Sequence, residues 1–317
     1  MSRCLVLGAN GFLGSHIVDA LVDHGHDVTA FDRFSSGETS YTASSVRRVI
    51  GDFLNHADLA EALKGQQNVF HFLSLTNPAI ADSQPTLDIR TNIAQSVDLF
   101  RLCVDNVVGK VYFASTGGAI YGDQGHAKYR ETDLALPISP YGIGKLTLEH
   151  YLRYFRVKHG LAAVSLRISN PYGARQHPHR KQGLIPIALR QAALGEPILR
   201  FGSGSMVRDF IHVEDVARII ATMTDAETLH DVYNLGSGQG HSVNDVLETI
   251  GKVTQLDLTV REVPTPATYV NEVVLETTRL KAEFDIGPLI SLRRGISRTW
   301  ESQLRDSSHH VSFNSLR

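Results

Sequence analysis

A glycine-rich run near the start of the chain, GANGFLG at residues 8–14, constrains the fold more than any other feature. It stands between an apolar run at 4–7, typical of a buried strand, and an amphipathic helical pattern at 15–24. Such glycines permit a tight turn, a close approach to pyrophosphate and close helix–strand packing, and the amides that begin the helix attract phosphate. The motif predicts a bound dinucleotide. We expect its contacts to come from Gly8, Asn10, Gly11, Phe12, Leu13 and Gly14.

A carboxylate at the end of the second predicted strand indicates which dinucleotide binds. Asp32 follows the strand at 28–31 and can accept hydrogen bonds from the adenosine ribose hydroxyls, while it repels a 2′-phosphate. This favours NAD over NADP, although Arg33 could stack on adenine or meet a phosphate, and Asp32 could simply be a solvated strand end. Asp52, after the strand at 48–50, could accept from the adenine amino group, and Phe53 follows it.

Short apolar runs and longer helical patterns alternate along the first half. Strands are predicted at 4–7, 28–31, 48–50, 69–73, 111–114 and 163–167, and helices at 15–24, 57–63, 92–104 and 140–158. This predicts an α/β fold, a doubly wound parallel (Rossmann) sheet with a smaller interleaved α/β substrate-binding lobe. We expect an NAD-binding domain at 1–170 with 212–238 returning to it, a lobe at 171–211 and 239–301, and a loosely packed polar tail at 302–317.

The best candidate for catalysis is a tyrosine–lysine pair at the start of the longest predicted helix. Ser139 suits the N-cap and Pro140 the first turn. Tyr141 and Lys145 are four residues apart, so both project from one helix face. An ammonium group beside a phenol lowers the pKa of the phenol, which would make Tyr141 a usable general base. The alternative is a chance spacing, with the lysine reaching to solvent.

Taken together, the motifs resemble the extended short-chain dehydrogenases, the nucleotide-sugar epimerase and dehydratase group. The resemblance reaches about residue 300. It rests on GANGFLG at 8–14, Asp32, GD at 51–52, STGGAIYG at 115–122, SPYGIGK at 139–145, NPYGARQ at 170–176, RDFIHVEDVA at 208–217 and YNLGSG at 233–238. It implies that Tyr141 is the base and that Lys145 assists it and holds the nicotinamide ribose. The usual third hydroxyl position is Gly117 here, so Thr116, our first choice, or Ser115 or a water takes that role.

The resemblance also implies the remaining contacts. Beyond the glycine run, Asp32, Arg33, Asp52, Phe53, Tyr141 and Lys145, the cofactor would meet Leu73, Ser74, Leu75, Asn92, Ser115 and Ile168. The substrate would meet Thr116, Tyr141, Asn170, Gly183, Leu184, Leu199, Phe201 and Arg208. Arg208 would clamp a diphosphate, because a guanidinium group presents a planar fork of donors. The alternative for Arg208 is a surface salt bridge to Glu214 or Asp215.

Two glycines indicate the reaction. Dehydratases of the group carry an Asp-Glu pair directly after the third hydroxyl, whereas Gly117 and Gly118 stand there in this chain. Without that acid the resemblance implies an NAD-dependent 4-epimerase of a nucleotide-diphosphate sugar. The two glycines would leave room for a 4-keto sugar to turn, or they could simply allow close packing. The alternatives are a 4-ketoreductase or dehydrogenase, and a non-catalytic NAD-binding protein. The stretch 264–269 lacks the arginine that grips the nucleotide in many members, so uridine, thymidine and guanosine stay open.

Composition narrows the partners and the compartment. A net charge of −2 predicts no nucleic-acid or membrane-surface binding, and we expect no membrane span or signal segment and a cytoplasmic protein. Cys4 and Cys103 are expected to be buried thiols, and the loop histidines His177 and His179 lack a zinc-like spacing, so we expect no metal. The family resemblance implies a homodimer through the helices at 92–105 and 140–158. Its apolar positions Leu99, Leu102, Leu148 and Leu152 fit either such a face or the core.

Overall fold

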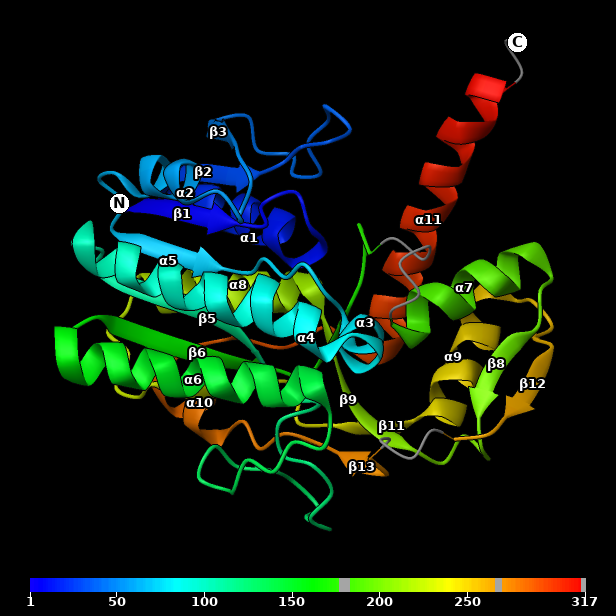
Figure 1. Cartoon of the computed structure of the whole chain (residues 1–317). Coiled ribbons are helices and arrows are strands. Elements are labelled where there is room, and N and C mark those ends of the chain that lie inside the picture. The colour runs from blue at the N-terminus through cyan, green and yellow to red at the C-terminus, as the bar shows by residue number, and fades with distance from the viewer. Residues whose placement is uncertain (177–182, 266–269, 315–317) are drawn as a thin grey trace.

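The structure, a computed structural model, describes residues 1–176, 183–265 and 270–314, with side chains as far as Arg305. Its centre is a seven-stranded sheet in the order β10-β6-β5-β4-β1-β2-β3, and every neighbouring pair is parallel (Figure 1). The strands are β1 (Arg3–Leu7), β2 (Asp27–Asp32), β3 (Val46–Ile50), β4 (Asn68–His71), β5 (Lys110–Thr116), β6 (Ala162–Ile168) and β10 (Val232–Leu235). The predicted doubly wound sheet is thus confirmed. The chain leaves β1 in one direction and returns in the other at β4, and ligands bind beside such a reversal.

Helices cover both faces of this sheet. On one face lie α1 (Phe12–Asp23) and α8 (Val213–Thr224), and on the other α2 (His56–Leu63), α5 (Ala94–Asp105) and α6 (Pro140–His159). Each face of the sheet has its own hydrophobic core, and successive residues of β1 point into opposite cores. Cys4 and Val6 pack with α1, whereas Leu5 and Leu7 pack with the helices on the other face. Apolar side chains on both faces explain why the sequence reads as short continuous apolar runs.

The connection from β4 to α5 is less regular than the sequence predicts. It consists of α3 (Pro78–Ser83), α4 (Pro85–Asp88) and a π-helical turn, η1 (Ile89–Ile93). A π turn inserts extra backbone into a helix and is frequent at functional sites. Here it joins two residues that line one cavity, Asp88 and Asn92.

The smaller lobe packs at one end of the sheet (Figure 1). Its core joins side chains of α7 (Leu184–Leu194), α9 (Val243–Thr254) and α11 (Leu292–Asn314), including Leu189, Ile250 and Ile296. Two strands, β8 (Ile198–Phe201) and β12 (Val260–Val263), pair along its edge. Between lobe and sheet, β9 (Val207–His212) pairs with β7 (Asn170–Tyr172), β11 (Gly240–Ser242) and β13 (Glu272–Val273).

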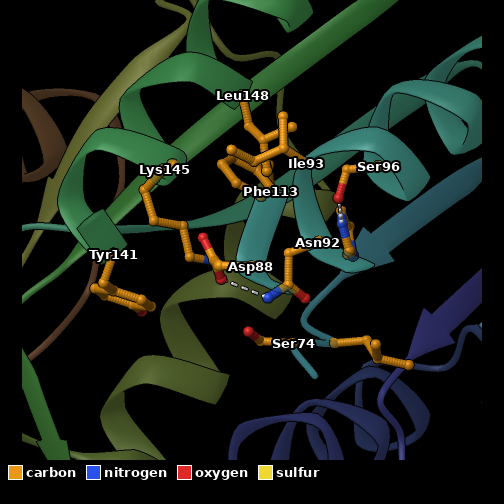
Figure 2. Close-up of a pocket in the computed structure, with 12 residues that line it drawn as sticks. Ser74, Asp88, Asn92, Ile93, Ser96, Phe113, Tyr141, Lys145 and Leu148 are labelled. Carbon is orange, nitrogen blue, oxygen red and sulfur yellow. Dashed lines mark hydrogen bonds between the residues drawn. The ribbon is translucent and has the colours of Figure 1, made fainter. Parts of the chain in front are cut away.

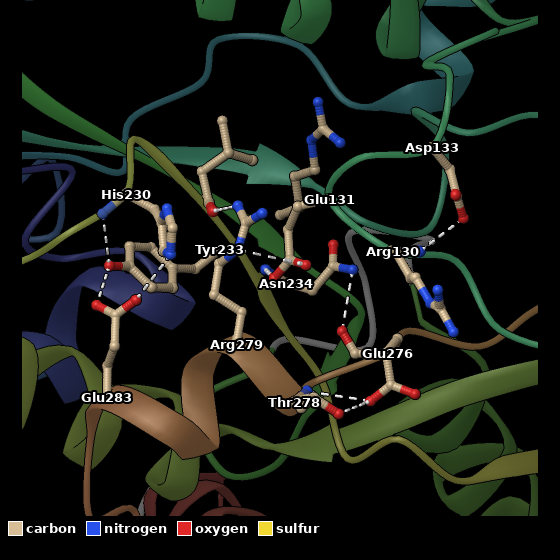
Figure 3. A network of polar contacts seen from close by, with 12 residues as sticks. Arg130, Glu131, Asp133, His230, Tyr233, Asn234, Glu276, Thr278, Arg279 and Glu283 are labelled. Atoms are coloured by element: carbon tan, nitrogen blue, oxygen red, sulfur yellow. Dashed lines mark hydrogen bonds and ion pairs between the residues drawn. The ribbon is translucent and has the colours of Figure 1, made fainter.

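One segment assigned to the lobe belongs with the sheet instead. The range 239–301 includes α10 (Thr278–Glu283), yet Leu280, Phe284 and Ile286 pack in the α1–α8 core. Figure 3 shows the polar contacts that hold it: Arg279 Nη1 donates to Val232 O at 2.8 Å, and Glu283 accepts from the Tyr233 hydroxyl. Because β10 is an edge strand, α10 passes beside its open edge and satisfies the Val232 carbonyl there.

The polar tail predicted from residue 302 begins as part of a helix. The helix α11 continues to Asn314 and extends away from the body of the molecule (Figure 1). Gln303 Nε2 donates to Pro186 O at 3.1 Å, which fixes this helix to α7. Among the described residues, no helix is both long and apolar enough to cross a bilayer.

Candidate active site

The glycine turn brings α1 unusually close to the end of β1. Gly8 has a φ of +81°, and a Cβ at Gly14 would lie 2.0 Å from Gly8 O, so neither position accepts a side chain without movement. The helix begins after Gly11 with no side-chain cap on its first amides. Uncapped amides at a helix N-terminus suit a phosphate, so the local geometry fits a dinucleotide.

Asp32 lies at the end of β2 and is half-buried. Its Oδ2 accepts from Asn10 N at 3.0 Å and its Oδ1 from Arg33 N at 2.7 Å, which fixes the carboxylate beside the glycine turn. The Asn10 side chain accepts from Ser40 N at 2.6 Å and donates to Glu38 O at 3.1 Å. The side chain of Asn10 therefore holds the loop that follows β2. We expect any contact of Asn10 with the cofactor to come from its backbone.

Three of the expected cofactor residues use their side chains elsewhere. Phe53 is 1% exposed and packs on His71 with ring centroids 5.4 Å apart. Ile168 is buried, and its carbonyl accepts from Gly117 N at 2.7 Å. Asp52 accepts from Leu54 N at 2.9 Å, as a turn residue does. Phe53 and Ile168 were expected as contacts, but their side chains belong to the core.

Tyr141 and Lys145 line one cavity with Leu73, Ser74 and Asn92 (Figure 2). The Ser139 side chain caps α6 by accepting from Gly142 N at 3.2 Å, with Pro140 in the first turn, as predicted. Lys145 Nζ donates to Ala114 O at 2.8 Å and lies 5.7 Å from the Tyr141 ring centroid. The expected sharing of one helix face is confirmed. Leu75, the next residue of this loop, donates its backbone N–H to Asn92 Oδ1 at 2.9 Å.

The protein alone does not lower the pKa of the tyrosine. Burial, and secondarily the charge of Asp88, raise the pKa of Tyr141 to about 12. Burial lowers the pKa of Lys145 to about 8, against the opposing charges of Asp88 and Glu149. The prediction that Lys145 lowers the pKa of Tyr141 is therefore not met by the protein's residues alone. Further positive charge is needed before Tyr141 can act as a base.

The two candidate hydroxyls of β5 differ sharply. Ser115 is buried and donates to Glu149 Oε1 at 2.5 Å, and that carboxylate also holds Arg167. Thr116 ends the strand, and within the described part of the chain its hydroxyl makes no hydrogen bond. The geometry therefore favours Thr116 as the third hydroxyl and argues against Ser115, whose proton is already committed.

The two glycines after Thr116 have different surroundings. A Cβ at Gly117 would lie 2.5 Å from Leu275 Cδ1 and 2.9 Å from Arg167 O, so this glycine serves close packing. A Cβ at Gly118 would meet Asn170 Oδ1 at 3.6 Å, an ordinary contact distance. Of these two glycines, only Gly118 has room for a side chain without movement of its neighbours.

Two of the expected substrate residues, Asn170 and Arg208, lie on paired strands between the lobe and the sheet. Asn170, on β7, donates to Asp209 O at 3.0 Å. Arg208, on β9, donates to the carbonyls of Val270 and Asn271. The alternative salt bridge is wrong, because Glu214 pairs with Arg298 and Asp215 with Arg218. Arg208 is thus anchored at the lobe boundary.

The other substrate candidates come from α7 and β8. Gly183 and Leu184 begin α7, and Leu199 and Phe201 lie on β8. His177 and His179 lie outside the described residues. In the described part of the chain, no group of His, Cys, Asp and Glu side chains is arranged to hold a metal ion.

The comparison with known families decides the classification. The profile of the NAD-dependent epimerase/dehydratase family matches residues 4–236, which span the glycine turn, the Tyr141–Lys145 pair and the return to β10. The chain belongs to this family. Its cofactor is NAD, and the uncapped turn with Asp32 beside it fits that group.

Members of known activity resemble the chain along nearly its whole length. The UDP-glucose 4-epimerase of Thermotoga maritima, solved with UDP-glucose, is 32% identical with a TM-score of 0.90 and covers 96% of this chain and 99% of its own. The UDP-glucose 4-epimerase of Thermus thermophilus, solved with NAD, is 31% identical with a TM-score of 0.87, over 95% and 98%. A dTDP-4-dehydro-6-deoxyglucose reductase of Escherichia coli is 28% identical over 94% and 96%.

Sequence reasoning missed several residues of this family member's site. His71 and Asp88 line the cavity with the pair, Thr76 donates to Asp88, and none of the three stands in a motif with a known spacing. Asp209, which is fully buried, accepts from Ser237 N at 2.8 Å and Gly238 N at 3.0 Å. It thereby joins the RDFIHV and YNLGSG motifs. Asp209 stands in the RDFIHV motif beside Arg208, but its partners in YNLGSG lie 28 and 29 residues away, so no local signal in the sequence indicates this contact.

Proposed function

We propose that the protein is an NAD-dependent 4-epimerase of a nucleotide-diphosphate sugar that works through a transient 4-keto intermediate. The observation that carries the proposal is the Tyr141–Lys145 pair in one cavity at the carboxyl end of the sheet, with glycines where a dehydratase needs an acid. The family and the epimerase relatives support it.

The chain's own residues would supply binding and proton transfer. Tyr141 would take the proton of the sugar 4-hydroxyl and later return it, while the Lys145 ammonium, held by Ala114 O, stabilises the phenolate. Thr116 would hydrogen-bond the same sugar oxygen. NAD supplies the site that accepts and returns the hydride. When bound, NAD would also bring the positive charge of its oxidised nicotinamide ring, which would lower the pKa of Tyr141.

The lobe would hold the nucleotide diphosphate. We place Asn170 and Arg208 at the diphosphate, Gly183 and Leu184 along the nucleotide, and Leu199 with Phe201 at the base. Both solved epimerases named above act on UDP-glucose, so UDP-sugars are the first substrates to test.

Cofactor balance separates an epimerase from a reductase. The protein, purified without additives, should convert a UDP-sugar to its 4-epimer in NMR assays with no cofactor added and no net change in NADH. Consumption of added NADPH in step with substrate would instead establish the ketoreductase alternative.

We further propose that the protein is a cytoplasmic homodimer. Leu99, Leu102, Leu148 and Leu152 are buried within the chain, so they belong to the core and not to an interface. Four other apolar side chains of α6 are exposed at spacings that fit one helix face: Ile143, Tyr151, Tyr154 and Val157. An exposed apolar stripe on a long surface helix supports two-fold pairing. The two buried free thiols suit a reducing compartment.

The double variant Tyr154→Glu/Val157→Glu should therefore elute as a monomer in size-exclusion chromatography with light scattering. Like charges brought together across a two-fold axis repel, and the apolar contact is lost. Leu256→Glu, at an exposed position after α9 in the lobe, is the control and should leave the mass unchanged. A double variant that stays dimeric would place the interface elsewhere.

A further inference from the structure

A buried carboxylate lies beside the catalytic pair and is fixed in place. Asp88 is 5% exposed, and its Oδ1 accepts from the Thr76 hydroxyl and, at 2.8 Å, from Asn92 Nδ2. Asn92 Nδ2 also reaches Thr76 Oγ1 at 2.8 Å. Figure 2 shows Asp88 between Asn92 and Lys145. With both neighbours bonded to one oxygen, the carboxylate cannot rotate freely.

The second carboxylate oxygen packs against α6 at the catalytic turn. Asp88 Oδ2 lies 2.9 Å from the position that a Cβ at Gly144 would take. Gly144 directly precedes Lys145, and both residues line the cavity together with Asp88 and Tyr141. A side chain at 144 would have to push the carboxylate away, so the glycine leaves the space that Asp88 uses.

The other ionisable groups around Lys145 do not provide a free negative charge. Glu149, one turn along α6, is committed to the Arg167 guanidinium group at 2.7 Å and to Ser115. His71, at the end of β4, is fully buried, and burial lowers its pKa to about 3, so it is neutral. Tyr141 carries its proton at neutral pH in the protein alone. Of the two carboxylates whose charge raises the pKa of Lys145, Asp88 and Glu149, Asp88 has the larger effect, and Glu149 is the one already paired with a cation.

We infer that Asp88 is a positioning residue of the catalytic pair, whose fixed carboxylate keeps Lys145 in its ammonium form inside the buried cavity. The same charge disfavours the Tyr141 phenolate, so Asp88 moves the working pH range of both groups upward. It acts through space, because the Lys145 ammonium donates to Ala114 O. The inference rests on the proposed catalytic role of the pair.

Competitive labelling tests this without any substrate. Asp88→Asn keeps the shape of the side chain and removes its charge. Acetylation of Lys145 by acetic anhydride, followed by mass spectrometry across a pH series, reports the ionisation of its amine. The wild-type midpoint should lie near the pKa of about 8, and the midpoint of Asp88→Asn about one unit lower, since an opposite charge nearby is lost. Asp98→Asn, on the exposed side of α5, is the control and should show no shift.

The pH profile of kcat gives a second readout. Both the acid and the alkaline limb should move to lower pH in Asp88→Asn, because loss of the negative charge lowers the pKa of Tyr141 and of Lys145 alike. A purely structural role would reduce activity or Tm without moving either limb. Asp88→Ser also removes the charge and must shift the labelling midpoint in the same direction. Unchanged midpoints in these variants would overturn the inference, even if epimerase activity is confirmed.

Discussion

Replacing Tyr141 by phenylalanine is expected to lower kcat by about a thousandfold while NAD stays bound. The change removes one oxygen, and with it the only phenol among the residues that line the described cavity. General base catalysis contributes about 10²–10⁴-fold to a rate, so the loss should fall in this range. NMR assay of the 4-epimer gives the rate, and absorbance or mass spectrometry of the released nucleotide gives NAD content.

A matched control comes from the same helix. Tyr151→Phe removes the phenol oxygen of a side chain that is 40% exposed on α6, away from the residues that line the cavity. It should keep wild-type kcat and NAD content. If Tyr141→Phe retained activity within tenfold of wild type, the tyrosine would not be the base. If it lost NAD as well as activity, a structural role would explain the result.

Glu149→Ala is expected to cost about 3–5 kcal/mol of unfolding free energy, because it leaves a buried guanidinium group without its partner. The two side chains are 7% and 6% exposed, and Arg167 Nη2 lies 2.7 Å from Glu149 Oε2. Arg167 also donates to the Tyr121 hydroxyl at 2.9 Å, which cannot neutralise its charge. Urea denaturation followed by circular dichroism measures the loss.

An ion pair on the surface provides the comparison for the buried Glu149–Arg167 pair. Glu214 and Arg298 form an ion pair whose side chains are 46% and 36% exposed, and Glu214→Ala should cost less than about 1 kcal/mol. The double variant Glu149→Leu/Arg167→Met should recover much of the loss, since it removes both charges. Equal losses for Glu149→Ala and Glu214→Ala would contradict the assigned role of the buried pair.

Local patterns were enough to predict the sheet and the glycine turn after its first strand. The strands at 4–7 and 28–31 and the glycines between them carry signals within a few residues of one another, because strand burial and turn conformation are local requirements. The shared helix face of Tyr141 and Lys145 follows in the same way from helical geometry.

Features that depend on distant partners were not predictable. The choice between Ser115 and Thr116 depends on Glu149, which is 34 residues from Ser115. The position of Asp88 depends on the π-helical turn that follows it and on its contact with Gly144 of α6. Neither feature has a sequence signature. The α10 crossing depends on the open edge of β10, which exists only once the sheet is assembled.

The central claim is that one hydride leaves the sugar C4 and returns to its other face within the same site. A UDP-sugar deuterated at C4 tests this most directly, with no cofactor added and the product analysed by NMR. The account predicts a 4-epimer that keeps its deuterium at C4. An epimer that has lost the label to solvent, or a reduced product formed only with added NADPH, would contradict it.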